Sequence, residues 1–241
     1  MMNAVVVVAT HNRRDLTGLT LDSVRRWCSG VADIVVLDDA STEYDTAWLA
    51  AFGAEVYRYP TRQGVGRMAR HRYEVGLRYC QQRGRSCMIL LDNDALLVRP
   101  RPVEAAVGWL QEYYNQASDA RRFAILSLYR STVHPVMCPS GLFGLDRMAT
   151  IGGINHCCGV ETAERILQIP KERWDKEWDW MFGHDTTGRR PKEISALTTP
   201  ITLLAPIRSG IEHTGRFGGG VNGESTDCGL NVWGDETTTR V

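Results

Sequence analysis

Short apolar runs that end in polar residues mark the first half of the chain. Ala4 to Ala9 is continuous and rich in β-branched residues, and Ile34 to Leu37 and Met88 to Leu91 are similar. Such uninterrupted runs are typical of strands that are buried on both faces of a sheet. Glu55 to Tyr59 resembles a shorter strand, which Pro60 stops.

Apolar residues at helical spacing occupy segments between these runs. Helices are predicted to start near Asp15, near Arg67 and near Val103 and to cover Glu161–Ile169, and a further strand is predicted over 123–128. Strand, helix and strand in this order predict parallel strands joined by right-handed crossovers. The polar ends of the strands should therefore lie together at one edge of the sheet, where open α/β sheets bind their ligands.

The strand at Met88–Leu91 runs directly into Asp92, Asn93 and Asp94. Two carboxylates so close together repel each other, and burying them without a counter-charge is costly. A divalent cation such as Mg²⁺ or Mn²⁺, which prefers oxygen ligands, would neutralise them. On these three residues alone a solvated turn is the more common explanation. The choice between a solvated turn and a cation site therefore depends on motifs elsewhere in the chain.

Composition bounds the class of protein. The 241 residues suffice for one large α/β domain or two small ones, and a hydrophobic fraction of 43% with a charged fraction of 23% is ordinary for an enzyme. Lys and Arg together number 28, as do Asp and Glu, which argues against non-specific adhesion to nucleic acid or acidic membranes. A soft boundary near residue 100 divides the chain into a nucleotide-side half, 1–100, and an acceptor-side half, 101–241, with a flexible C-terminal tail.

The seven cysteines are an odd number and include no CxxC pair. A disulfide framework is therefore not expected, and a reducing compartment is favoured. His156, Cys157 and Cys158 are interpreted as buried structural residues because no second cluster at zinc spacing accompanies them. No apolar run reaches the length of a membrane span and no signal peptide is recognised. We expect a cytoplasmic protein, and a homodimer is compatible with the sequence.

A dinucleotide-binding domain would also begin with strand, helix and strand. Its fingerprint places glycines after the first strand so that the backbone can approach a pyrophosphate. Residues 10–15 contain no glycine, which disfavours a nicotinamide cofactor. In the second half, tryptophans and acidic residues share the segment 174–180, a combination found both in sugar-binding surfaces and in interior packing.

Taken in order, these segments resemble the glycosyltransferases of the GT-A fold, in particular family 2. The resemblance implies a single α/β domain with a Rossmann-like, mostly parallel sheet flanked by helices. It further implies four sets of residues that contact the nucleotide, its diphosphate or a metal: Thr10, His11, Asn12 and Arg13 after the first strand; Asp38 and Asp39 in a V-D-D-x-S-like segment; Gly64, Arg67 and Arg70 in a G-x-x-x-A-R-like segment; and Asp92 and Asp94 in place of the D-x-D motif.

The resemblance continues on the acceptor side. The stretch from Gly141 to Ile154 is similar to the segment that ends in G-G-F beside the acceptor. Glu177 takes the position of the catalytic base, which is ordinarily an aspartate, and Asp179 is the alternative. His213, in His-Thr-Gly, matches the C-terminal histidine that completes the metal site in many GT-A enzymes.

The implied activity is metal-dependent transfer of a sugar from a UDP- or GDP-sugar to an acceptor hydroxyl, with Mn²⁺ or Mg²⁺ as the cofactor. Attack in line with the leaving diphosphate would invert the anomeric centre. A glycan, a lipid-linked sugar, a small polyol, a protein or a modified DNA base would all fit as acceptors. The alternatives are a retaining GT-A enzyme, a sugar nucleotidylyltransferase and a non-catalytic nucleotide-sugar binding module.

Overall fold

The apolar runs at the start of the chain form four adjacent parallel strands. In this computed structural model, which describes residues 4–118, 123–131, 134, 136–142, 144–175 and 201–214, β1 (Ala4–Thr10) lies between β2 (Ala32–Asp38) and β4 (Cys87–Asp92). The short β3 (Glu55–Arg58) pairs with the outer side of β2. All three predicted apolar strands are thereby confirmed, and Val5 to Val8 of β1 are fully buried.

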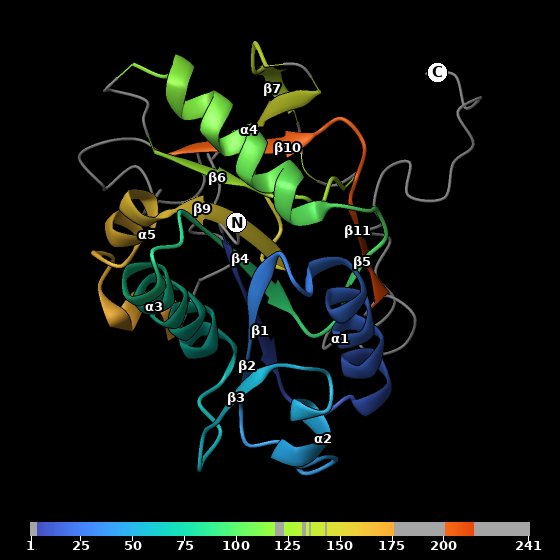
Figure 1. The fold of residues 1–241 in the computed structure, drawn as a ribbon. Coiled ribbons are helices and arrows are strands. Elements are labelled where there is room, and N and C mark those ends of the chain that lie inside the picture. Colours follow the sequence, from blue (N-terminus) through green and yellow to red (C-terminus); the bar gives the residue numbers. More distant parts are fainter. Residues whose placement is uncertain are drawn as a thin grey trace.

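Beyond β4 the nine-stranded sheet becomes mixed in direction (Figure 1). Its order is β3-β2-β1-β4-β9-β6-β10-β8-β7. The added strands are β6 (Ala124–Leu126), β7 (Val136–Pro139), β8 (Leu145–Met148), β9 (Asn155–Gly159) and β10 (Thr202–Pro206). A separate two-stranded sheet joins β5 (Ala95–Leu97) to β11 (Ile211–His213).

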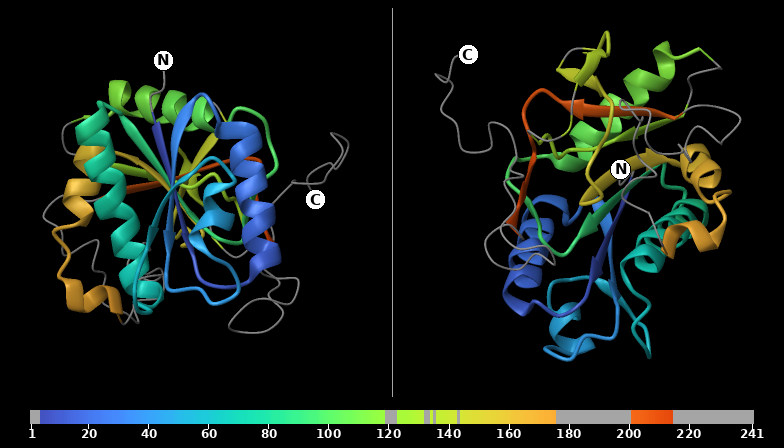
Figure 2. Two further views of the ribbon diagram at one scale, coloured as in Figure 1. Left: turned by 60° about the horizontal axis from the view of Figure 1, so that its bottom comes forward. Right: turned by 180° about the vertical axis from the view of Figure 1, so that it is seen from behind.

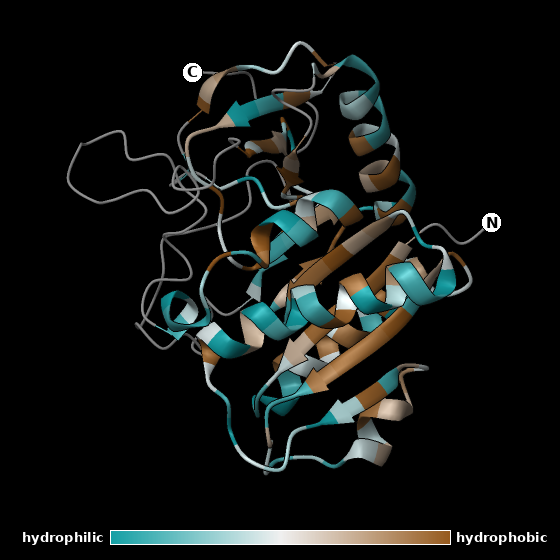
Figure 3. Cartoon of the chain, turned by 90° about the vertical axis from the view of Figure 1, so that its left-hand side faces the viewer, coloured by the Kyte–Doolittle hydropathy of each residue, from teal (hydrophilic) through white to brown (hydrophobic). Residues whose placement is uncertain are grey.

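Helices cover both faces of the large sheet (Figure 2). Residues of α1 (Arg14–Cys28) and α4 (Pro102–Gln116) pack with Val6 and Val8 of β1 on one face. Residues of α3 (Val65–Arg83) and α5 (Val160–Ile166) pack with Val5 and Val7 on the other. The short α2 (Thr46–Ala50) precedes β3. Because alternate strand residues point to opposite faces, one apolar strand supplies both cores. The strands between the helices are largely brown, the colour of hydrophobic residues, in Figure 3.

Local sequence signals set the ends of the helices. Pro102 occupies the first turn of α4, where its missing N–H costs nothing. Helix α3 begins after Gly64, which has φ 87°, and ends at Gly84, whose φ of 63° is the left-handed conformation common after helices. The fold is therefore the α/β class that the sequence predicted, a central sheet with helices on both faces.

The cysteines and the helix lengths bear on two predictions from the sequence. Cys157 and Cys158 are fully buried, as predicted, and the six cysteines within the described ranges are free thiols. Among the helices of the described ranges, none combines the length and the apolar character needed to cross a bilayer.

Candidate active site

The carboxyl ends of three parallel strands meet at one edge of the sheet. Thr10 at the end of β1 is in register with Asp38 of β2, and Ala9 is in register with Asp92 of β4. The prediction that these polar strand ends share an edge is therefore confirmed. The loops that follow them supply the side chains of the candidate site.

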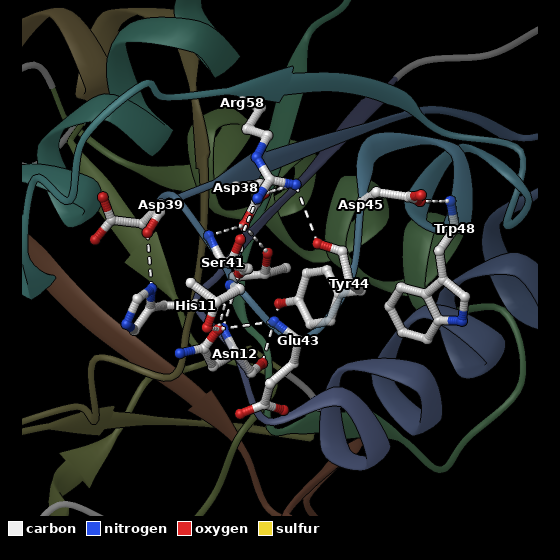
Figure 4. Close-up of polar contacts among 12 residues, drawn as sticks. His11, Asn12, Asp38, Asp39, Ser41, Glu43, Tyr44, Asp45, Trp48 and Arg58 are labelled. Atoms are coloured by element: carbon white, nitrogen blue, oxygen red, sulfur yellow. Dashed lines mark hydrogen bonds and ion pairs between the residues drawn. The ribbon is translucent and has the colours of Figure 1, made fainter.

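Asn12 holds two of these loops together (Figure 4). Its backbone N–H donates to Ser41 Oγ at 2.8 Å, and its side-chain Oδ1 accepts from the Thr42 N–H at 2.7 Å. Asn12 and Arg13 both have positive φ, 52° and 57°, a conformation that asparagine tolerates better than most residues. The strained turn after β1 is thus fastened to the loop after β2.

Asp38 and Asp39 are both buried, at 0% and 3% exposure, and their carboxylates hold the site together. Asp38 Oδ1 accepts from the Ser41 backbone and hydroxyl, and Oδ2 lies 3.3 Å from Arg58 Nη1. The Asp39 carboxylate accepts from the backbone N–H groups of Gln63 and Gly64, just before α3. Nucleotide contact by these two residues remains a prediction, whereas their structural bonds are observed.

His11 lies beside this pair. Its Nδ1 is 2.7 Å from the backbone carbonyl oxygen of Asp39. A carbonyl oxygen only accepts hydrogen bonds, so the neutral imidazole of His11 carries its proton on Nδ1. Its Nε2 is then left as an acceptor.

Asn93 turns inward and braces the site. Its Nδ2 donates to Thr17 Oγ1 at 2.9 Å and to the Asn12 carbonyl at 3.3 Å. The middle residue of Asp92-Asn93-Asp94 therefore ties the turn after β4 to the start of α1. The two aspartates on either side of it are directed to different partners.

Asp94 is brought to His213 by strand pairing. His213 in β11 is in register with Ala95 in β5, and the Thr214 N–H donates to the Asp94 carbonyl at 2.9 Å. His213 Nε2 consequently lies 3.4 Å from Asp94 Oδ2, which the Arg13 guanidinium also contacts. Burial raises the pKa of Asp94, but the hydrogen bond and charge of His213 and the charge of Arg13 outweigh it, so the pKa lies below its ordinary value.

Asp92 points elsewhere, to Arg72. The distance from Arg72 Nη1 to Asp92 Oδ1 is 2.6 Å, and Arg72 is only 3% exposed on the apolar face of α3. Sequence reasoning missed this arginine. Its available signal was its helical spacing, four residues after buried Met68 and four before buried Gly76.

The two arginines that the sequence singled out on α3 have other partners. Arg67 pairs with Asp175 at 3.2 Å, and Arg70 pairs with Glu74 at 2.8 Å and donates to the Ile169 carbonyl. The contacts of Arg67 with Asp175 and of Arg70 with Ile169 connect α3 to the chain that follows α5. The structure thus brings Arg13 and Arg72, but not Arg67 or Arg70, to the carboxylates of the Asp92–Asp94 segment.

Gly66 allows this following chain to approach α3. A side-chain Cβ at Gly66 would lie 1.8 Å from the Trp174 carbonyl oxygen, and Trp174 itself is fully buried. The backbone at Trp174 is therefore fixed against the first turn of α3. Glu177 and Asp179, the two candidates for the base, lie outside the described residues.

A glycine also makes room in the segment from Gly141 to Ile154. A Cβ at Gly152 would lie 3.0 Å from His134 Nε2, while His134 Nδ1 is 2.8 Å from Thr150 Oγ1. The nearby Tyr129 ring packs edge-on to His213, with 6.1 Å between ring centroids. The Gly152 segment and the Asp94–His213 pair are thereby connected through Tyr129.

The donor atoms suit a divalent cation only in part. Within the described ranges, no three His, Cys, Asp or Glu side chains gather as a metal cluster. Asp94 and His213 do come together, and Mg²⁺ in enzymes commonly has only one or two protein ligands, with water and substrate phosphates completing its shell. One carboxylate and one imidazole fit such a cation, whereas Asp92 is held by Arg72.

Comparisons with known proteins show the family and the fold. The sequence model described as Glycosyl transferase family 2 matches residues 5–160. A comparison with curated protein sequences found no match. Three solved structures match the chain at low sequence identity. S. aureus TarS is 15% identical, with 85% of this chain and 35% of that chain covered and a TM-score of 0.53, and S. aureus TarS 1-349 in complex with UDP is 16% identical, with 84% of this chain and 57% of that chain covered and a TM-score of 0.52. The mannosyltransferase PcManGT from Pyrobaculum calidifontis in complex with GDP-Man and Mn²⁺ is 17% identical, with 83% of this chain and 56% of that chain covered and a TM-score of 0.49. The chain spans less than two thirds of the length of each.

Proposed function

The chain belongs to glycosyl transferase family 2, and from this premise we propose that it transfers a sugar from a nucleoside diphosphate sugar to an acceptor hydroxyl with the help of a divalent cation. The observation that carries the proposal is the apposition of Asp94 and His213 at the carboxyl edge of the sheet. Two separate segments, the turn after β4 and β11, converge there on one carboxylate.

Asp94 and His213 would hold Mn²⁺ or Mg²⁺. When bound, such a cation neutralises the charge that develops on the leaving diphosphate. The Asp94 carboxylate does not select between the two metals, because carboxylate oxygen suits both of them. We place Asp92 beside the ribose or the cation, with Arg72 fixing the direction of its carboxylate.

The loops after β1 and β2 would hold the nucleoside. Thr10 ends β1 and is followed by His11 and Asn12, whereas Asp38 ends β2 and is followed by Asp39. Both carboxylates already accept hydrogen bonds from the protein. Their main contribution to nucleotide binding would therefore be to fix the shape of the loops around the nucleotide. The solved TarS structure of similar fold contains UDP, so a uridine or guanosine diphosphate sugar is the donor class that we would test first.

A carboxylate must take the proton of the acceptor hydroxyl as its oxygen attacks the sugar. Glu177 is the first candidate and Asp179 the second, because the segment 176–180 takes the place of the segment that carries the catalytic base in family 2. Direct attack would invert the anomeric centre, and general-base assistance contributes about 10²–10⁴-fold. A retaining reaction on the same fold is the principal alternative.

Release products separate this proposal from its competitors. A glycosyltransferase releases a nucleoside diphosphate, a nucleotidylyltransferase releases pyrophosphate, and a binding module releases neither. We would screen UDP- and GDP-sugars with Mn²⁺ by thermal shift, where a ligand at a hundredfold excess over its Kd stabilises the fold by about 2.7 kcal/mol. Diphosphate release would then be measured with glycan, lipid-linked sugar, polyol, protein and modified DNA acceptors. Pyrophosphate release, or binding without turnover across all acceptors, would contradict the proposal.

The free thiols support a proposal for the compartment. Six cysteines in the described ranges are free, five of them buried, which suits a reducing environment. We therefore propose that the reaction takes place in the cytoplasm.

A further inference from the structure

Asp94 carries two contacts on the same oxygen. Its Oδ2 meets the Arg13 guanidinium and lies 3.4 Å from His213 Nε2. The Asp94 side chain is 9% exposed, whereas the Arg13 side chain is 28% exposed. The carboxylate is thus already neutralised by a cationic side chain of the protein itself.

The backbone of Arg13 is fixed, but its side chain is long enough to move. Arg13 caps α1 in a left-handed conformation, and its carbonyl accepts from the Thr17 N–H at 2.9 Å. Asn12 on one side is bonded to the loop after β2. A change in the partner of the guanidinium would therefore require rotation of the side chain and no rearrangement of the loop.

A divalent cation bound at Asp94 would stand beside this guanidinium. Two cations at one carboxylate oxygen repel each other strongly in a partly buried site. A diphosphate brings negative oxygens that a guanidinium can bind in a forked geometry. The repulsion is then relieved, because the guanidinium exchanges one anionic partner for another.

We propose that Arg13 couples cation binding to nucleotide binding: it occupies Asp94 while the nucleotide is absent and transfers to the diphosphate when the cation and the nucleotide bind together. The cation then binds weakly alone and tightly in the presence of the nucleotide. This inference rests on the proposed function, since it assumes that Asp94 is a cation ligand and that a diphosphate binds beside it. The exchange of partners by Arg13 would make tight binding of the cation depend on the nucleotide, which Asp94 and His213 by themselves would not do.

The test is a set of calorimetric titrations of Mn²⁺ into the full-length protein, alone and with saturating UDP or GDP. In the native protein we expect the nucleotide to raise Mn²⁺ affinity about tenfold or more, within the range usual for coupled sites. In Arg13→Met, which keeps the apolar stem and removes the charge, Mn²⁺ alone should bind about tenfold more tightly. The enhancement by nucleotide should then fall well below the native value, to the part that direct coordination of the cation by the phosphates supplies.

Arg14→Met is the matched control. Arg14 is the next residue, and it donates to the Glu43 carbonyl and lies over the Trp48 ring instead of contacting Asp94. Its Mn²⁺ affinity and its coupling should equal those of the native protein. Arg13→Lys, which keeps the charge, should retain part of the coupling.

Two outcomes overturn the inference. If Arg13→Met leaves the Mn²⁺ affinity and the coupling unchanged, or weakens Mn²⁺ binding in the absence of nucleotide, Arg13 does not compete for Asp94. Asp94→Asn separates this failure from failure of the proposed cation site. If Asp94→Asn still binds Mn²⁺ like the native protein, the cation site itself is wrong, and the role of Arg13 falls with it.

Discussion

Arg72 Nη1 lies 2.6 Å from Asp92 Oδ1, so a buried arginine of α3 fixes the first carboxylate of the Asp92–Asp94 segment. Replacing Arg72 with Met keeps an apolar stem but leaves Asp92 without this counter-charge. We expect the free energy of unfolding to fall by about 1–3 kcal/mol, because a partly buried charge loses its partner. Urea denaturation would measure it. Arg78→Met, at an exposed position of the same helix, should stay within about 0.5 kcal/mol, and equal losses in both variants would contradict the role of the ion pair.

Removal of the cation ligand should abolish turnover without unfolding the protein. In Asp94→Asn the amide keeps the shape of the side chain and can still accept from Arg13, but it no longer carries the charge that binds a cation. We expect diphosphate release to fall by about 10²-fold or more, as for the loss of a group that stabilises developing charge. EDTA should have the same effect on the native enzyme, and Mn²⁺ or Mg²⁺ should reverse it. Full activity in EDTA would eliminate the metal assignment.

Gly66 should tolerate no side chain. Alanine there would place its Cβ 1.8 Å from the Trp174 carbonyl oxygen, so the chain after α5 has to move away from α3. We expect a loss of about 3 kcal/mol or more in thermal or urea unfolding, a cost typical of overpacking in a rigid interior. Gly108→Ala in α4 is the control, because its added Cβ has no atom of the described residues within 4 Å other than those of its own helix. That change should be neutral or stabilise by up to about 1 kcal/mol.

Stability should decrease as the pH falls below 6.5, in part because of His156. Burial, followed by the charge of Arg72, lowers the pKa of His156 to about 3, whereas an unfolded histidine has a pKa of about 6.5. Between these values the unfolded chain binds a proton that the folded protein does not, so the free energy of unfolding falls with pH by about 1.4 kcal/mol per unit. Between pH 7 and pH 5 this source contributes about 2 kcal/mol. His156→Gln should lack that part of the pH dependence, and an identical slope in both proteins would show that another group is responsible.

Glu177 should act in the chemical step and not in donor binding. Glu177→Gln keeps the size of the side chain but cannot accept the hydroxyl proton. Transfer should fall by about 10²-fold or more, while nucleotide-sugar binding measured by thermal shift should survive. Asp179→Asn should have a smaller effect. The reverse order would move the base to Asp179, and activity in both variants would favour a retaining mechanism.

The strands that carry the nucleotide side could be predicted because their buried residues are continuous in sequence. In β9, by contrast, Asn155 and His156 interrupt the apolar pattern, although both are buried. These residues have distant hydrogen-bond partners: Asn155 bonds to Leu128 and Leu90, and His156 Nδ1 bonds to the Tyr73 hydroxyl. Such partners are invisible to periodicity, so this central strand was missed. The three-residue strands β5 and β11 are too short to leave any pattern.

Some site residues could likewise be predicted from the order of the elements, whereas others depend on tertiary contacts. The meeting of Thr10, Asp38 and Asp92 follows from parallel strand topology, which the order of elements predicts. The pairing of Asp94 with His213 was predicted only through a family resemblance, because local sequence says nothing about which distant strand pairs with β5. Arg72 was missed because an arginine on a helix usually reaches solvent, and its burial depends on tertiary packing around Asp92.

The pairing of β5 with β11 has a consequence for how the protein is made. Thr214 lies 120 positions after Asp94, so the two halves of the proposed cation site leave the ribosome far apart in time. Contacts of such long range carry a large loop-closure cost and form late in folding. We expect backbone amides of β11 to gain protection from hydrogen exchange after those of β1 during refolding, and simultaneous protection would contradict this order. The growing chain would then bind no cation until its sheet had already assembled.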